Sequence, residues 1–433
     1  MSGQKQEKCG LPSWPPFRKF DLPLRGGYIP TPGSARYLNN HMNFNFPLLK
    51  PIRILLFPIS LVYALIVRMR NWCYDRNIFS TTSFNLPIIC VGNLAVGGTG
   101  KSPMVELLIR TLKDRFEIAV LSRGYKRKTR GYALANASST ALDIGDEPMQ
   151  FHSKFPDLTV AVGEERIVAI PQLLHDRPDT QAILLDDAFQ HRSVKAGLNI
   201  LLTDYSNLFT RDWWLPSGDL RDAPGSYRRA DLIIVTKCPE DLSESERRSI
   251  IHEVDPLKHQ QIFFSSIQYG QPYHITGGDI STSYADNKNS GQPAETGAAA
   301  TVEIDDKMEV LLVTGIANPA PLKKWLDERS EAYYELAYSD HHIFSIDDLN
   351  NITRRFNSIP ARNKIILTTE KDAVRLVKFR QELEGWPFYV LPIEPRFLFD
   401  DQPRFTDLIV KFITNFSAVP ATNLPGPAPK ENV

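Results

Sequence analysis

The chain has 433 residues, of which 42% are hydrophobic and 23% are charged, so it can bury sizeable cores and is not wholly disordered. At roughly 150 residues per domain, this length predicts two or three domains. Fifty Lys and Arg residues balance fifty Asp and Glu residues, which excludes a global electrostatic attraction to nucleic acid or to an anionic surface. Any attraction to anions must therefore be local. The four cysteines form no CxxC pair and no zinc-type cluster with histidines, which favours a reducing compartment.

The N-terminal part combines a polar arm with an apolar segment. Residues 1–40 are rich in Pro and Gly and lack apolar periodicity, which predicts a flexible arm. The first long apolar run, 54–67, would reach only about 21 Å as a helix, so we do not expect it to span the roughly 30 Å hydrocarbon core of a membrane. Between residues 41 and 76, five basic residues face one acidic residue, a local charge of +4. A helix over 44–76 in an anionic membrane interface and a buried core helix explain this segment equally well.

From residue 85 onwards, short apolar runs alternate with helical stretches, a pattern typical of a parallel sheet with helices on both faces. We therefore predict an α/β domain of the doubly wound kind over residues 41–260. The polar segment 277–303 predicts a flexible insertion, and a second, smaller α/β domain should cover 306–416. Residues 417–433 are expected to be disordered. The strands predicted for the first domain are 86–91, 118–121, 159–162, 182–187, 199–204 and 231–237.

The segment 91–102 (VGNLAVGGTGKS) directly follows the first predicted strand and contains A-x4-G-K-S, a phosphate-binding loop with Ala95 where Gly is commoner. Its backbone N–H groups can surround phosphate oxygens, Lys101 can reach the β- and γ-phosphates, and Ser102 can ligate Mg²⁺. Apolar residues at helical spacing predict a helix after the loop. A Gly-rich turn without a ligand is the alternative. The expected nucleotide-binding residues are Ala95, Val96, Gly97, Gly98, Thr99, Gly100, Lys101 and Ser102.

Acidic residues occur where a nucleotide site would need them. Asp186 and Asp187 end an apolar strand, so we expect them beside the phosphate-binding loop as Mg²⁺ ligands, unless they only start a turn. Asp146 lies with an adjacent Glu just before Pro148, where catalytic chemistry and helix capping explain it equally well.

Basic residues and histidines give weaker signals. The loop 121–132 holds five basic residues, including Arg123, which suit phosphate groups but are also typical of a solvated loop. His341 and His342 are adjacent, but no third ligand is spaced nearby for a metal ion, and surface histidines are the favoured interpretation.

Together these segments resemble the tetraacyldisaccharide 4′-kinase family, the lipid A 4′-kinases, from about Phe44 to Phe416. The resemblance implies a P-loop NTPase-like sheet domain with an N-terminal membrane-associated helix and a second, smaller α/β domain. It also implies transfer of the γ-phosphoryl group of ATP to the 4′-hydroxyl of a lipid A disaccharide 1-phosphate, in lipopolysaccharide biosynthesis. Such an enzyme would be peripheral or monotopic at the cytoplasmic face of the bacterial inner membrane. The motifs that carry the resemblance, in order, are NLAVGGTGKSP, VLSRGYKRK, IGDEP, LLDDAFQHR, LPSGDLRD, VTK, GIANP, SDHHIF and TEKDAV.

The resemblance also implies roles for individual residues. Asp146 would take the proton of the sugar hydroxyl, and His341, from the other lobe, would orient or tune it. Lys101 and Mg²⁺ would neutralise charge on the phosphoryl group. Asp219 departs from the family pattern, which commonly has Arg there, and Ala188 replaces a common Gly. No nucleic-acid partner and no obligatory protein partner are expected. The implied metal ligands are Ser102, Asp186 and Asp187, and the implied substrate contacts are Arg123, Gln190, His191 and Arg221.

Three other functions are weighed against this one. A membrane-cycling ATPase switch would carry Lys where this chain has Val96. A GTPase would need N-K-x-D, but residues 236–239 read TKCP, which favours adenine. A non-catalytic nucleotide-binding scaffold would not need Asp146 and His341.

Overall fold

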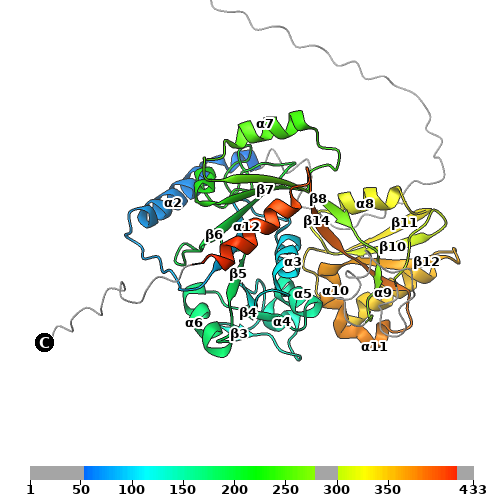
Figure 1. The fold of residues 1–433 in the computed structure, drawn as a ribbon. Helices are drawn as coiled ribbons and strands as arrows, with labels where there is room; N and C mark the ends of the chain where they lie inside the picture. Colours follow the sequence, from blue (N-terminus) through cyan, green and yellow to red (C-terminus); the bar gives the residue numbers. More distant parts are fainter. Residues whose placement is uncertain (1–52, 278–300, 417–433) are drawn as a thin grey trace, which may run out of the picture. The chain divides into compact units, whose positions relative to one another are not determined.

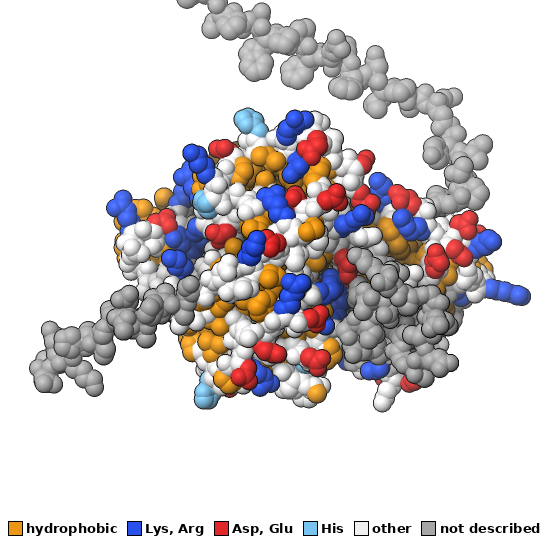
Figure 2. Space-filling view, viewed as in Figure 1, with side chains coloured by type: hydrophobic (Ala, Val, Ile, Leu, Met, Phe, Trp, Pro, Cys, Tyr) orange, Lys and Arg blue, Asp and Glu red, His pale blue; other side chains and the backbone are white. Residues whose placement is uncertain are grey.

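A computed structural model describes residues 53–277 and 301–416 of this chain (Figure 1). The expected arm and tail lie outside these ranges, as do residues 44–52 of the expected interfacial helix and most of the expected insertion. The described residues form a nine-stranded sheet and a five-stranded sheet with helices packed against both. The predicted α/β class is therefore confirmed. Acidic and basic side chains are interspersed on the face shown in Figure 2, as the balanced net charge predicts.

The nine-stranded sheet has the order β14-β8-β7-β6-β1-β5-β2-β4-β3. Its strands from β8 to β4 are parallel, and the two edge strands β14 and β3 are antiparallel to their neighbours. Six of these strands coincide with the six apolar runs predicted for the first domain. The bounds are β1 Ile88–Asn93, β2 Ile118–Ser122, β3 Ala133–Leu134, β4 Thr159–Val162, β5 Ala182–Asp186, β6 Leu198–Asp204, β7 Leu232–Thr236, β8 Gln261–Tyr269 and β14 Ile393–Phe397.

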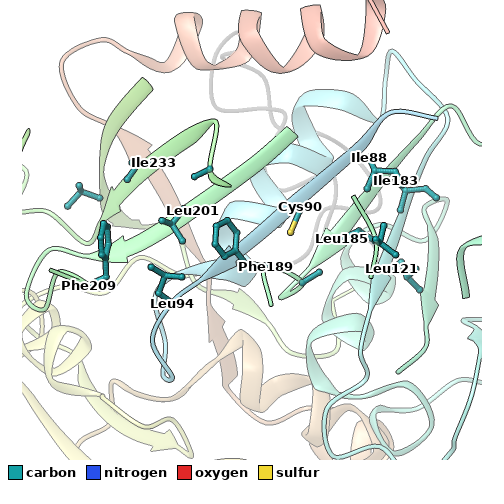
Figure 3. Close-up of a cluster of buried hydrophobic side chains, with 14 of the residues drawn as sticks. Ile88, Cys90, Leu94, Leu121, Ile183, Leu185, Phe189, Leu201, Phe209 and Ile233 are labelled. Atoms are coloured by element: carbon teal, nitrogen blue, oxygen red, sulfur yellow. The ribbon is translucent and has the colours of Figure 1, made fainter. Parts of the chain in front are cut away.

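Each face of this sheet is covered by its own helices, which explains why its strands are apolar on both sides. On one face, side chains of β1, β2, β5, β6 and β7 pack with α6 and α7, and Figure 3 shows part of this cluster around Cys90 and Phe189. On the other face, α3, α5 and α12 cover the sheet with residues such as Leu108, Phe151 and Ile409. The bounds are α3 Lys101–Leu112, α4 Ala141–Ile144, α5 Asp146–Lys154, α6 Arg166–Asp176, α7 Glu244–Val254 and α12 Gln402–Thr414.

The five-stranded sheet has the order β11-β10-β12-β13-β9, in which only β9 is antiparallel to its neighbour. Its two faces pack against α9 and α10 on one side and against α8 on the other. This is the second, smaller α/β unit. The bounds are β9 Tyr273–His274, β10 Glu309–Thr314, β11 Ala332–Ala337, β12 Lys364–Thr369, β13 Phe388–Leu391, α8 Ala320–Asp327, α9 Ile346–Asn357, α10 Glu370–Leu376 and α11 Arg380–Leu383.

The sheets correct the predicted domain limits of 41–260 and 306–416. Strand β8 extends the first sheet beyond residue 260, and β9 joins the second sheet before the expected insertion. After β13 the chain returns to the first sheet, because β14 pairs with β8 and α12 buries Phe405 and Ile409 against that sheet. The second unit is therefore inserted between elements of the first. Local sequence patterns predict the strands and helices but do not indicate which sheet each of them joins.

The apolar segment near the N-terminus forms α2 (Phe57–Asp75), with Pro58 in its first turn. The side that α2 buries is small and partly polar, with Ser60, Ala64, Val67 and Asn71. No helix among the described residues is long and apolar enough to cross a membrane. The large apolar residues exposed on α2 are Phe57, Ile59, Leu61, Val62, Leu65, Ile66, Met69 and Trp72.

Candidate active site

The phosphate-binding loop lies between β1 and α3, as predicted. The predicted helix residues Val105, Leu108, Ile109 and Leu112 are all fully buried against the sheet. Gly100 precedes α3 with a φ of 79°, a left-handed conformation that favours glycine. The first backbone N–H groups of α3 therefore follow a tight turn, which is the arrangement that binds anions at a helix N-terminus.

Neighbouring strands hold the loop in place. Asn93 Nδ2 donates to Thr99 Oγ1 at 2.8 Å, and Thr236 Oγ1, at the end of β7, donates to the Thr99 carbonyl at 3.0 Å. On the other side, Val96 N donates to the Asp219 carbonyl at 2.8 Å. Hydrogen bonds to these neighbouring segments thus hold the loop in place.

The paired acids lie where the sequence predicted, because Asp186 ends β5, which is the direct neighbour of β1. Asp187 has a φ of 48°, and its Oδ1 lies 3.8 Å from Lys101 Nζ. Burial favours the neutral form of Asp187, but Lys101 and Arg221 outweigh it and lower its pKa to about 2. Burial and the charge of Asp187 raise the pKa of Asp186 to about 6. Two adjacent carboxyl groups therefore face the loop, one with a raised pKa and one with a lowered pKa.

These residues fit a magnesium ion. Ser102 offers a hydroxyl at the start of α3, and Asp186 and Asp187 offer carboxylates, the hard oxygen donors that Mg²⁺ prefers. Burial first, and then the negative charge of Asp187, raise the pKa of Asp186, and a bound cation would oppose both influences. The residues that the structure describes contain no group of three or more His, Cys, Asp and Glu side chains suited to a metal ion. A hydroxyl with two carboxylates needs no such group, since nucleotide phosphates complete the shell of Mg²⁺ in phosphoryl-transfer sites.

The four predicted substrate contacts lie in different environments. Arg221 donates to both carboxylate oxygens of Asp187, with Nη1–Oδ2 at 3.1 Å. Gln190 Nε2 donates to the Asn93 carbonyl at 2.7 Å, so its amide supports the end of β1. Burial, helped by nearby arginines, lowers the pKa of His191 to about 4, and Arg123 is exposed. Arg221 and Gln190 therefore support the loop directly, whereas His191 is a neutral ring at neutral pH.

Asp146 is the first residue of α5, and its carboxylate does not cap that helix. Gly145, the preceding residue, has a φ of 95°, and a Cβ there would lie 3.0 Å from the Gly124 Cα. This close approach brings the loop after β2 against the start of α5. It leaves the Asp146 carboxylate buried and directed at residues of the second sheet.

His341 approaches Asp146 from the loop after β11. Its Nδ1 lies 2.7 Å from Asp146 Oδ2, and its Nε2 lies 3.2 Å from Lys371 Nζ. The ionised Asp146 carboxylate can only accept, so the proton on Nδ1 points to Oδ2 and Nε2 accepts from the Lys371 ammonium group. Arg375 Nη2 also lies 2.8 Å from Nδ1, on the side where both groups face the carboxylate. His341 also has a φ of 64°, a strained conformation for a non-glycine residue. The predicted pair is therefore brought together, and His341 acts on Asp146 as a hydrogen-bond donor.

Arg375, on α10, is a member of this site that the sequence did not predict. Its Nε donates to Asp146 Oδ1 at 2.8 Å, and its Nη2 donates to Asp146 Oδ2. Burial opposes ionisation of Asp146, but the hydrogen bonds from Arg375 and His341 outweigh it and lower its pKa to about 2. The only available signal was the motif TEKDAV, which ends one residue before Arg375.

The two parts of the site are electrostatically connected. The charge of Glu147, the neighbour of Asp146, contributes to the pKa values of both Lys101 and Asp186. Burial lowers the pKa of Lys101, and Asp187 most strongly opposes that shift. The start of α5 therefore faces the phosphate-binding loop, with Asp146 on the side of the second sheet.

The two departures from the family pattern have local explanations. Ala188 is buried in the core beside β1, so its methyl group packs with apolar neighbours. Asp219 accepts from Arg53 Nη2 at 2.7 Å, and its own carbonyl receives the N–H of Val96 in the loop. Asp219 therefore ties the segment before α2 to the phosphate-binding loop.

Comparisons with known proteins identify the family of this chain. A family model described as tetraacyldisaccharide-1-P 4'-kinase matches residues 52–414. A tetraacyldisaccharide 4'-kinase of Bacteroides thetaiotaomicron is 44% identical over 365 residues, 83% of this chain and 92% of that protein. A protein of the same name from Flavobacterium johnsoniae is 42% identical over 84% of this chain and 97% of its own length. A crystal structure of LpxK from Aquifex aeolicus in complex with ATP has a similar fold, with a TM-score of 0.62 and 24% identity over 84% of this chain and 99% of that chain. The resemblance inferred from the motifs is thus confirmed, and the chain belongs to the tetraacyldisaccharide-1-P 4'-kinase family.

Proposed function

We propose that this chain is an ATP-dependent kinase that transfers the γ-phosphoryl group to the 4′-hydroxyl of a tetraacyldisaccharide 1-phosphate, a lipid A precursor. The observation that carries the proposal is the contact between Asp146, at the start of α5, and His341, in the loop after β11, in a chain that also has a phosphate-binding loop between β1 and α3. A carboxylate held ionised beside a nucleotide site is suited to receive the proton of an attacking hydroxyl. Membership of the family supplies the identity of the acceptor.

On the acceptor side, Asp146 takes the proton of the 4′-hydroxyl. Its pKa of about 2 keeps it ionised throughout the neutral range, and a weak base suffices because the transition state of phosphoryl transfer is loose and the proton leaves late. His341 donates its Nδ1 proton to Oδ2 of Asp146, which fixes the direction of the carboxylate. The histidine therefore orients the base and does not itself remove the proton.

On the donor side, the backbone of the loop and the N-terminus of α3 bind the phosphates of ATP. Lys101 lies between the loop and Asp187, where its ammonium group can neutralise charge on the transferred phosphoryl group. Ser102, Asp186 and Asp187 would hold Mg²⁺, which when bound would supply positive charge against the phosphates. Arg221 holds Asp187 in the ionised form that this role needs.

We further propose that α2 docks the enzyme on the cytoplasmic face of the bacterial inner membrane. An ordinary surface helix buries its large apolar residues, whereas α2 buries Ser60 and Asn71 and exposes Leu61 and Leu65. Basic residues follow the exposed apolar face, with Arg76 near the Trp72 ring at 5.7 Å. This combination suits insertion of the helix into an anionic interface, which would bring a lipid acceptor to Asp146.

The other function classes fit the site less well. A membrane-cycling ATPase switch would present Lys at the position of Val96, and a scaffold that only binds nucleotide has no use for the strained backbone of His341. A phosphoryl-acceptor base accounts for the contact between His341 and Asp146.

Product analysis tests the proposal. The purified chain is incubated with γ-labelled ATP, Mg²⁺ and tetraacyldisaccharide 1-phosphate in detergent micelles, and the lipid product is analysed by mass spectrometry after mild acid removes the 1-phosphate. We expect label on the 4′ position. Hydrolysis of ATP without labelled lipid would favour an ATPase switch instead. Binding of ATP without turnover of either kind would favour a scaffold.

A further inference from the structure

The motif TEKDAV and the following arginine, residues 369–375, are not used by the nucleotide chemistry described above. Within the second sheet, Thr369 Oγ1 donates to Asp372 Oδ2 at 2.7 Å, and Gly315 N donates to the same oxygen at 3.0 Å. Asp372 is fully buried, so these contacts fix the start of α10 to the second sheet. The remaining charged residues of the motif, Glu370, Lys371 and Arg375, contact another element.

Those residues form ion pairs with α5 of the first sheet. Glu370 pairs with Lys154, the last residue of α5, and Lys371 Nζ lies 4.0 Å from a carboxylate oxygen of Glu147. Arg375 pairs with Asp146, the first residue of α5. The motif therefore contacts both ends of the helix that begins with the proposed base.

Arg375 is the most constrained of these contacts. It is buried, and its planar fork contacts both oxygens of Asp146. Its Nη1 lies 3.9 Å from Asp372 Oδ1 and 3.4 Å from the His342 carbonyl. The guanidinium is therefore itself held in position by residues of the second unit. Compared with well-packed apolar side chains in the same place, a buried ion pair adds little net stability, because desolvation costs about as much as attraction returns. Its more specific consequence is geometric, because two parallel hydrogen bonds fix the plane of a carboxylate.

We infer that Arg375 is a positioning residue of the phosphoryl-transfer reaction, which fixes the Asp146 carboxylate beside His341 and joins this base to the second sheet. The inference rests on the function proposed above. It assigns to the motif at 369–375 the task of aligning the base with the acceptor hydroxyl. Removing the guanidinium takes away the largest influence that lowers the pKa of Asp146, so this pKa must rise, and among the described residues only His341 is left to orient the carboxylate.

Two substitutions separate orientation from charge. Arg375→Met removes both the positive charge and the two parallel N–H donors of the guanidinium. Arg375→Lys keeps a positive charge but lacks the two parallel donors. Arg380→Met is the matched control, because Arg380 lies in the same unit and contacts only a backbone carbonyl among the described residues. For each variant, kcat and KM for both substrates are measured from pH 5 to pH 9, and folding is checked by circular dichroism and ATP binding.

We expect Arg375→Met to lower kcat by about 10- to 100-fold with a KM for ATP within about 2-fold of wild type, since misplacing a reacting group by about 1 Å costs about 10²-fold. A new decline in kcat towards acid pH should appear in this variant. Arg375→Lys should show a smaller loss of kcat without that decline, and Arg380→Met should match wild type. If Arg375→Met fails to fold, the kcat loss of Arg375→Lys decides the question.

The inference is overturned if Arg375→Met keeps wild-type kcat and pH dependence, or if Arg375→Lys keeps wild-type kcat where Arg375→Met does not fold. Asp146→Asn, measured in parallel, shows which idea has failed. An inactive Asp146→Asn beside an active Arg375→Met rejects only the role of Arg375. Full activity of Asp146→Asn rejects the proposed base itself.

Discussion

Asp146 and His341 are 195 residues apart in the sequence, yet Oδ2 of the first lies 2.7 Å from Nδ1 of the second. The contact joins the start of α5 on the nine-stranded sheet to the loop after β11 on the five-stranded sheet. Each residue adopts its position through an unusual backbone feature, a glycine with positive φ before Asp146 and a positive φ at His341 itself. The base of the proposed reaction is therefore assembled from both sheets.

Lys101 offers the simplest test of the donor side. Substitution of Lys101 by Met removes the one ammonium group between the loop and Asp187 among the described residues, so charge on the transferred phosphoryl group is no longer neutralised. We expect kcat to fall by about 10²-fold or more, as for loss of one stabilising donor in other enzymes. Steady-state kinetics with Lys113→Met as control make the comparison, since Lys113 is exposed at the far end of α3. Equal turnover numbers in the two variants would show that Lys101 takes no part in the reaction.

The Asp146 ion pair predicts a pH dependence of stability. The folded-state pKa of about 2 lies below the ordinary 3.8, so the pair contributes stability that is fully present above about pH 4 and is lost as pH falls towards 2. This shift corresponds to about 2 kcal/mol at neutral pH. We expect Asp146→Asn to be less stable than wild type by at least this amount at pH 7, with the difference narrowing below pH 4. Urea unfolding at several pH values measures it, and a difference that stays constant down to pH 2 would contradict the assignment.

The exposed face of α2 predicts membrane binding. Leu65 is 67% exposed although it lies in the middle of the helix, and Leu61 is on the same face. Replacing both by Ser should weaken binding to phosphatidylglycerol and phosphatidylethanolamine vesicles by about 10²- to 10⁴-fold, because each buried Leu contributes about 1.5–3 kcal/mol.

Co-sedimentation with vesicles tests this docking surface. The control is the pair Val168→Ser and Ile346→Ser, which are also exposed apolar residues but lie on α6 and α9. Equal vesicle binding by the α2 variant and this control would show that α2 is not the docking surface. A loss confined to the α2 variant, with activity on a micellar acceptor retained, supports it.

The sequence predicted the features whose signals are local. The loop 91–102, its helix and the six central strands each depend on consecutive residues, and Asp186 is placed by the strand that precedes it. Contacts between distant segments were out of reach, because nothing near Arg375 indicates a partner 229 residues away. The return of β14 and α12 to the first sheet was missed for the same reason, since their apolar periodicity does not say which sheet they cover.

The sequence alone also could not decide the role of a single residue, Asp146. Its position before Pro148 is equally typical of a helix cap and of a catalytic acid or base. The structure distinguishes the two, because the carboxylate contacts His341 and Arg375 and makes no capping hydrogen bond to α5. Resemblance to the family favoured the catalytic role of Asp146. Only the folded structure shows that Arg375 contacts its carboxylate.

The central claim is that Asp146 acts on the acceptor hydroxyl and not on the nucleotide, and one comparison tests it most directly. The dissociation constant for ATP and the single-turnover rate of 4′ phosphorylation are measured for wild type and for Asp146→Asn. We expect Asp146→Asn to have a dissociation constant within about 2-fold of wild type and a rate lower by about 10²- to 10⁴-fold, the contribution of a general base. A rate near that of wild type, or a loss explained entirely by weaker ATP binding, would contradict it.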